Sequence, residues 1–203
     1  RRRRTMFVLR AGCKVPFPEK LSEEYMLIEN QIIANISADK IKDIMNHFIY
    51  IHEEPVFFIL ELPSKQDNEE EIRPGIVEKM HKDVYYIDEC TGEEAFTILL
   101  RIGDLMINDG LCSFGFGCHE SEDEIVFGKY NVTTIFSKNI NQYNSFMAEH
   151  GIAKSEDIVT AWDTFSQENP GISERIEMDG KDIYSIPEMF ADWGIYKAEQ
   201  REC

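Results

Sequence analysis

The chain has 203 residues, of which 43% are apolar and 11% aromatic. This composition supplies enough apolar surface for a sizeable core and excludes a wholly disordered chain. The formal net charge is -17 and no basic run follows residue 4. Because phosphate binding depends on clustered Lys and Arg, we expect neither nucleic acid nor an anionic membrane as a partner.

The first residues of the chain and its cysteines indicate where the domain starts and in which compartment it is expected. Arg1 to Arg4 precede Met6, which looks like a natural start, so residues 1–5 are expected to be an added or disordered tail and residues 6–203 one domain. Without those arginines, 17 basic residues face 38 acidic ones, a net charge of -21. Five cysteines at wide spacings and apolar runs far below membrane-spanning length predict free thiols in a reducing cytoplasm.

The first part of the chain contains one clear helix. Residues 6–10 alternate weakly and predict a strand, and residues 11–24 predict a loop. Residues 25–36 have a high apolar content, but neither the helical nor the strand periodicity prevails, so the sequence does not decide between helix and strand. Ser37 is a candidate N-cap for a helix whose apolar residues follow at i, i+3, i+4 and i+7, namely Ile41, Ile44, Met45 and Phe48.

A buried strand and a second helix come next. Residues 56–60 are all apolar and predict a strand that is buried on both faces. Residues 64–74 are polar and acidic and predict a loop, whereas residues 83–87 predict another strand. Thr91 and Glu94 form the signature of a capping box, and the helix behind it is expected to stop near residues 108–110.

Three neighbouring strands are predicted in the middle of the chain. They cover residues 111–118, 124–128 and 132–137, and the acidic residues 119–123 would form a hairpin loop between the first two. Because strands follow one another here without intervening helices, the sequence favours a mixed or largely antiparallel sheet with helices packed on it, an α+β domain.

Short helices and a turn are expected toward the end. Asn139 and Ser155 are candidate N-caps, and the second helix would turn Ile158, Trp162 and Phe165 inward. Asp179-Gly180 is typical of a tight hairpin. Ser185-Ile-Pro-Glu188 has the pattern of another capping box.

No motif points clearly to catalysis. Phe114-Gly115-Phe116-Gly117 lacks the third glycine of a dinucleotide loop and the Gly-Lys-Ser/Thr of a P-loop, so we interpret its glycines as places of close approach. Residues 118–124 hold one Cys-His pair and several carboxylates, which leaves a metal-assisted enzyme as an alternative. No nucleophile elbow is present. We therefore expect neither an enzyme nor a cofactor.

Surface acidity is the strongest remaining feature. It falls into three clusters, and loops on a firm scaffold are where binding residues concentrate. Tyr130, Phe127 and Trp162 are candidate aromatic anchors for a partner. The candidate partner-binding residues from the three clusters are Asp67, Glu69, Glu70, Glu71, Asp88, Glu89, Glu120, Glu122, Asp123 and Glu124, with Tyr130 beside them.

Three stretches of sequence carry a family resemblance. They are residues 107–137, Thr160 to Phe165 and Ser185 to Glu188. Together with the acidic surface, these stretches resemble immunity proteins encoded beside bacterial polymorphic toxins, including those of contact-dependent growth inhibition. The resemblance implies a non-enzymatic protein that binds one basic toxin domain, often a nuclease, and blocks it. A general regulatory binding module is the other alternative.

Overall fold

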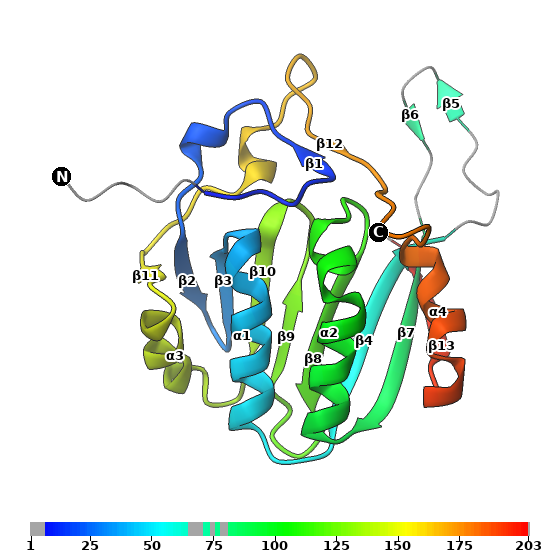
Figure 1. Cartoon of the computed structure of the whole chain (residues 1–203). Coiled ribbons are helices and arrows are strands. Elements are labelled where there is room, and N and C mark those ends of the chain that lie inside the picture. Colours follow the sequence, from blue (N-terminus) through cyan, green and yellow to red (C-terminus); the bar gives the residue numbers. More distant parts are fainter. Residues whose placement is uncertain (1–6, 65–70, 74–75, 78–80, 203) are drawn as a thin grey trace.

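A nine-stranded sheet runs through the protein, whose residues 7–64, 71–73, 76–77 and 81–202 are described by a computed structural model (Figure 1). The strand order is β11-β2-β3-β10-β9-β8-β4-β7-β13. Within this sheet β11 and β2 pair in parallel, and each other neighbouring pair is antiparallel. The predicted α+β class with a largely antiparallel sheet is confirmed.

The strands of the main sheet are between two and ten residues long. Their bounds are β2 Glu24–Ile28, β3 Gln31–Asn35, β4 Val56–Pro63, β7 His81–Cys90, β8 Ser113–Cys118, β9 Glu124–Phe127, β10 Val132–Phe136, β11 Ala153–Lys154 and β13 Tyr196–Glu202. Two small antiparallel pairs stand apart from it, formed by β1 Cys13–Lys14 with β12 Ile172–Ser173 and by β5 Glu71–Arg73 with β6 Ile76–Val77.

Two long helices, α1 Ala38–Ile51 and α2 Gly92–Asn108, lie side by side on one face of the sheet (Figure 1). The shorter helices are α3 Tyr143–Glu149 and α4 Ile186–Met189, and the 3-10 turns are η1 Pro18–Lys20, η2 Lys129–Asn131, η3 Ile140–Gln142, η4 Ala161–Thr164, η5 Ile183–Ser185 and η6 Ala191–Trp193. We call the face away from α1 and α2 the second face.

The two long helices form where the sequence predicts them. In α1 the apolar residues of the predicted stripe are all buried. In α2 the capping box is complete, because the Thr91 hydroxyl accepts from the Glu94 N–H while the Glu94 carboxylate accepts from the Thr91 N–H. Ser37 does precede α1, but its hydroxyl accepts from the Val8 N–H instead of capping the helix. The N-terminal segment is thereby tied to the start of α1.

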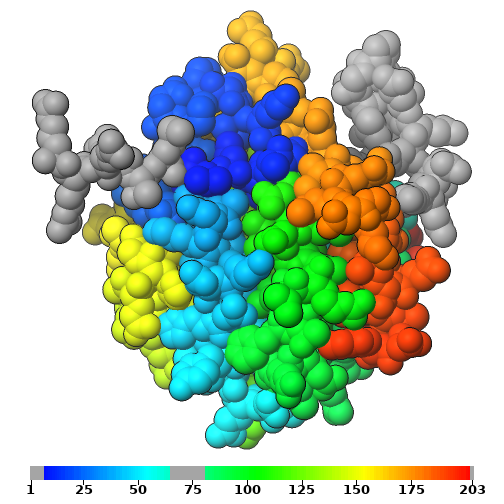
Figure 2. Space-filling model, in the orientation of Figure 1, coloured from blue at the N-terminus to red at the C-terminus, as the bar shows by residue number. Residues whose placement is uncertain are grey.

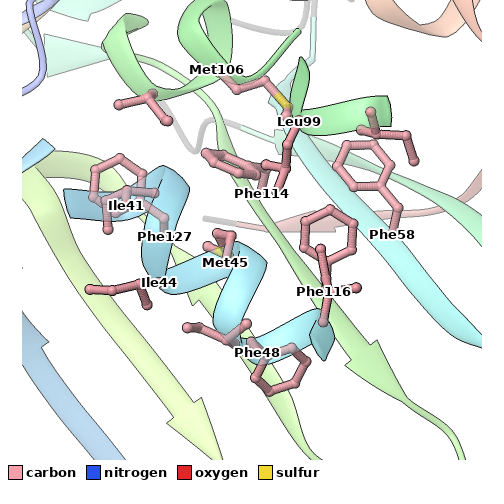
Figure 3. Packing of buried hydrophobic residues seen from close by; sticks show 14 of the residues in the cluster. Ile41, Ile44, Met45, Phe48, Phe58, Leu99, Met106, Phe114, Phe116 and Phe127 are labelled. Atoms are coloured by element: carbon pink, nitrogen blue, oxygen red, sulfur yellow. The ribbon is translucent and has the colours of Figure 1, made fainter. Parts of the chain in front are cut away.

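The main core lies between these helices and the sheet. Figure 3 shows aromatic rings of the sheet, among them Phe58, Phe114 and Phe127, meeting apolar side chains of α1 and α2. Each of those three rings is fully buried. Burying a side chain of this size contributes about 2 kcal/mol, so this layer holds the helices firmly to the sheet.

The Phe-Gly-Phe-Gly run serves the centre of the sheet. Phe114 and Phe116 point into the core, and the intervening glycines occupy the second face. A Cβ at Gly117 would lie 2.1 Å from the ring of Phe57, and one at Gly115 would lie 1.8 Å from the carbonyl oxygen of Ile125. The interpretation of these glycines as places of close approach is confirmed.

Three predictions about local structure are corrected, and one that the sequence left open is decided. Residues 7–10 form no strand, because their hydrogen bonds go to the side chains of Ser37 and Asn131. The open stretch 25–36 is the hairpin of β2 and β3. In place of a helix from Ser155 there is only η4, and Trp162 is 53% exposed. Part of the predicted loop 64–74 is β5.

Of two local signals near the C-terminus, the first lies where the sequence predicts it and the second is shifted. The Asp179-Gly180 turn is present, with positive φ at both residues. The capping box that follows is formed by Asp182 and Ser185, three residues before the predicted one. The last strand, β13, was not predicted.

A second, smaller core closes the end of the sheet near β1 and β12. Its buried members are Cys13, Leu21, Tyr130 and Ala161. Arg10 is fully buried beside it and donates to the carbonyls of Met106, Ile107 and Gly128. Because three carbonyls satisfy this buried cation, the end is held by polar contacts as well as by packing.

The four cysteines within the described residues are free, as predicted, and all four are buried, whereas Cys203 lies outside these residues. Burial raises the pKa of Cys90 and that of Cys112 to about 12 each, so neither thiol is activated. Among the helices of the described part, none is long and apolar enough to cross a membrane.

Candidate functional site

Two of the three acidic clusters meet at one end of the sheet. Val56, the first residue of β4, pairs with Cys118 at the end of β8 and with Cys90 at the end of β7. The turn between α1 and β4 therefore lies between the β8–β9 turn and the start of α2. This register brings together residues 53–54, 88–94 and 119–122, which are far apart in sequence.

The carboxylates gathered there are all exposed. We call them the acidic end, which comprises Glu53, Glu54, Asp88, Glu89, Glu93, Glu94, Glu120 and Glu122. Glu53 and Glu54, which follow the end of α1, were not among the predicted site residues. Only the strand register reveals that they bridge the other two segments.

Few of these carboxylates are neutralised within the protein. Glu122 forms an ion pair of 2.8 Å with Lys138, and both side chains are more than half exposed. Glu54 accepts from the Gly92 N–H, Glu94 caps α2, and Asp88 accepts from the Tyr196 hydroxyl at 2.7 Å. Within the described residues, no cation other than Lys138 forms an ion pair with the acidic end.

Asp123 does not belong to this surface, which corrects its prediction as an exposed contact residue. Its side chain is only 3% exposed, and one carboxylate oxygen serves three partners. His52 Nε2 lies 2.9 Å away, and the Tyr143 hydroxyl and Gln142 amide donate to it at 2.7 and 3.1 Å. We call these four residues the Asp123 network.

The Asp123 network holds the acidic end in place. His52 ends α1, Asp123 precedes β9, and Tyr143 begins α3. His52 Nδ1 lies 2.7 Å from the Phe48 carbonyl oxygen, so the ring is held by its own helix on one side and by Asp123 on the other. The result is a hydrogen-bonded cluster that joins three elements beneath the exposed carboxylates.

A His-Asp pair also invites comparison with a catalytic dyad, and its surroundings do not fit one. The hydroxyl nearest to His52 is that of Tyr143, at 3.2 Å, and Tyr143 has no exposed surface. Burial, together with donation to Asp123, raises the pKa of Tyr143 above its ordinary value. A buried phenol that resists ionisation is a poor nucleophile or base for a substrate.

Glu124 faces away from the acidic end, onto the second face of the sheet. There it lines a groove of about 560 Å³, the sheet groove, together with Glu61, Lys82 and Trp162. Burial, followed by the charge of Glu61, raises the pKa of Glu124. Glu61 is held by Lys82 at 2.6 Å and by Arg201 at 3.6 Å, so the charges of this face are largely balanced.

The remaining predicted residues lie elsewhere. Tyr130 is only 4% exposed and packs edge-on against Trp162 and Phe165 in the smaller core, so it is not a surface anchor. Phe127 is fully buried. The predicted residues Asp67, Glu69 and Glu70 lie outside the described residues, and so does the side chain of Glu71.

A groove between α1 and α2 opens beside the acidic end. It has a volume of about 600 Å³, and we call it the helix groove. Tyr50 and Leu100 on its rim are each 81% exposed, and Phe96 is 38% exposed. Figure 2 shows that α1 and α2 form the surface on this side. Sequence reasoning missed these residues because each lies outside the buried stripe of its helix.

The alternative of a metal-assisted site at residues 118–124 finds no suitable ligand set. In the described part of the chain, no three His, Cys, Asp or Glu side chains are placed to hold a metal ion together. The His119 ring packs at a tilt against Phe57 with ring centroids 4.6 Å apart, while the Cys118 thiol faces the Glu53 carbonyl.

A scan against protein-family models, a search of curated proteins and a search of solved structures each found no match to this chain.

Proposed function

We propose that this protein binds a basic partner protein through the acidic end, and that the partner is a bacterial toxin domain which it neutralises. The convergence of eight exposed carboxylates, with one exposed lysine paired to them among the described residues, carries this proposal. Like charges held so close repel one another, and a cationic surface on a partner relieves that repulsion.

The firmness of the site supports binding as the function. The Asp123 network joins two of the segments that carry the acidic end, the α1–β4 turn and the β8–β9 turn, and Glu54 links the first of them to the start of α2 by accepting from the Gly92 N–H, so docking requires little ordering of the backbone. A pre-organised surface loses less conformational entropy on association, which favours affinity. Uncompensated charge around such a surface steers the partner and speeds its association.

The toxin identity rests on the family resemblance and on electrostatics. A nuclease must present a basic surface to hold phosphates, and an acidic protein can cover that surface as a phosphate mimic. The buried thiols of raised pKa and the buried Tyr143 are consistent with a protein that acts by binding.

The test uses the toxin domain encoded next to the gene for this protein. Co-expression should protect cells from that domain, and the two proteins should form a complex whose association slows as salt is raised. If the neighbouring domain kills despite co-expression and no complex forms, the immunity function is wrong.

The docking surface is tested by a matched pair of triple variants. Glu53→Gln, Glu89→Gln and Glu120→Gln take one carboxylate from each converging segment, and none of the three side chains has a partner in the described part of the chain. We expect this variant to associate about tenfold more slowly at low salt and with a flatter salt dependence.

The matched control variant places the same change at the other end of the sheet. Glu19→Gln, Glu156→Gln and Glu168→Gln also remove three exposed carboxylates, and they should lower the rate far less. Equal rates and salt slopes for the two variants would show that net charge alone steers the partner, and would remove the acidic end as the docking surface.

A further inference from the structure

The helix groove has the form of a seat for one more helix. Lys42, Asn46 and Tyr50 follow one another every four residues along α1, and Glu93, Phe96 and Leu100 form a matching row on α2. Rows of this kind are the ridges between which a third helix packs. From Lys42 to Tyr50 the groove spans about 12 Å, a little over two helical turns.

The two ends of the helix groove differ in charge. At one end Lys42 and Asp104 form an ion pair of 2.7 Å that links α1 to α2. At the other end Tyr50 and Phe96 lie next to Glu53, Glu54 and Glu93, because α1 ends and α2 begins there. The apolar groove therefore opens directly onto uncompensated negative charge.

The exposure of the apolar side chains on the rim is typical of a surface that a partner covers. Tyr50 and Leu100 are the most exposed large apolar side chains in the described part of the chain. Single exposed apolar residues are ordinary, but three around one groove are characteristic of an interaction surface. Aromatic and aliphatic side chains at such a place supply most of the binding energy, and surrounding charges set the rate of association.

We propose that the helix groove binds an amphipathic basic helix of the partner, whose apolar face covers Tyr50, Phe96 and Leu100 and whose Arg or Lys side chains meet the acidic end. Charge complementarity selects this occupant, since an acidic or neutral helix would leave the carboxylates beside the groove unpaired. The inference rests on the proposed function and assigns to it the segment of the partner that carries most of the affinity.

The probe is a synthetic helical peptide with leucines on one face and arginines on the other. Fluorescence anisotropy should detect its binding to the full chain, whereas a peptide with the same leucines and with glutamates in place of the arginines should not bind. Leu100→Arg should weaken binding of the basic peptide by about tenfold, and Tyr50→Ala by about fivefold, because each removes apolar contact in the groove.

Ile172→Arg is the matched control. It adds the same charge at a side chain that is 46% exposed in β12, far from the groove, and it should leave the peptide affinity within about twofold of the parent. Because Leu100 is exposed, its variant should keep the thermal stability of the parent. Equal loss in both arginine variants would mean general charge repulsion and would overturn the proposal.

Three other outcomes would also overturn it. Loss of peptide binding in Trp162→Ala but not in Leu100→Arg would place the peptide in the sheet groove. Self-association of the parent chain that Leu100→Arg abolishes would identify a second copy as the occupant. If the toxin domain still binds and responds to the acidic-end triple variant while Leu100→Arg changes nothing, the groove inference fails and the proposed function stands.

Discussion

The acidic end and the second face of the sheet both carry carboxylates, and they use them in different ways. On the second face, Glu61 lies 2.6 Å from Lys82 and 3.6 Å from Arg201, so its charge is compensated within the fold. At the acidic end, Glu53, Glu89 and Glu120 have no such partner among the described residues. A carboxylate is therefore free to meet a partner protein only where the fold supplies no cation of its own.

Asp123 differs from both groups because it is buried, and its substitution should give the largest loss of stability. Asp123→Ala would remove the acceptor for the Tyr143 hydroxyl, which is fully buried, and the partner of the largely buried His52 ring. Leaving buried polar groups without a partner costs about 3 kcal/mol of unfolding free energy, measured by urea denaturation.

Glu122→Ala is the control for this prediction. It removes a neighbouring carboxylate whose ion pair with Lys138 is exposed, and the loss should stay below about 1 kcal/mol. Similar losses in the two variants would mean that Asp123 is an ordinary surface carboxylate.

Most local elements could be predicted because their signals lie within one stretch of chain. The capping box at Thr91 and Glu94 and the all-apolar β4 are of this kind. The strand β13 was missed because Lys197, Glu199 and Arg201 are typical of an exposed edge and carry no apolar alternation.

The site was harder to predict, since it depends on contacts between distant residues. In the sequence Asp123 looks like one more charge in an acidic run, and its burial is explained only by its contacts with His52, 71 residues earlier in the chain, and with Tyr143. Likewise, the assembly of Glu53 with Glu89 and Glu120 depends on the pairing of Val56 with Cys90 and Cys118.

Removing the lysine of an ion pair should have a smaller effect on stability, and this effect should differ between the two regions. Lys82→Ala leaves Glu61 partly buried with Arg201 as its more distant cation, and should cost about 1 kcal/mol of unfolding free energy. Lys138→Ala breaks the exposed pair with Glu122, and thermal denaturation should show a loss of only a few tenths of a kcal/mol, in the range typical of exposed ion pairs. A larger loss for Lys138→Ala than for Lys82→Ala would contradict the conclusion that the fold compensates the charge of Glu61 on the second face.

The smallest expected effect is the pH-dependent contribution of Glu124 to stability. The pKa of Glu124 is raised in the folded protein, chiefly by burial and then by Glu61, so the folded state binds the proton more tightly than the unfolded chain. The carboxylate therefore lowers stability above its folded pKa, and this penalty disappears as the pH falls below the ordinary value of 4.5.

Glu124→Gln should accordingly raise the unfolding midpoint slightly at neutral pH and leave it unchanged in acid. The control, Glu168→Gln, changes an exposed carboxylate outside the acidic end and should give no such pH-dependent gain. A gain for Glu124→Gln that persists in acid would show that its origin is not the burial of charge.

The Asp123 network also has an evolutionary consequence. Because it uses one residue of an acidic turn to lock the scaffold, it separates the positions that maintain the fold from those that choose a partner. Asp123, His52 and Tyr143 are constrained by one another. Glu120 and Glu122, on the same turn, can change sign or size without disturbing them. Descendants of this chain could thus diverge to recognise new partners while inheriting an unchanged support beneath the contact surface.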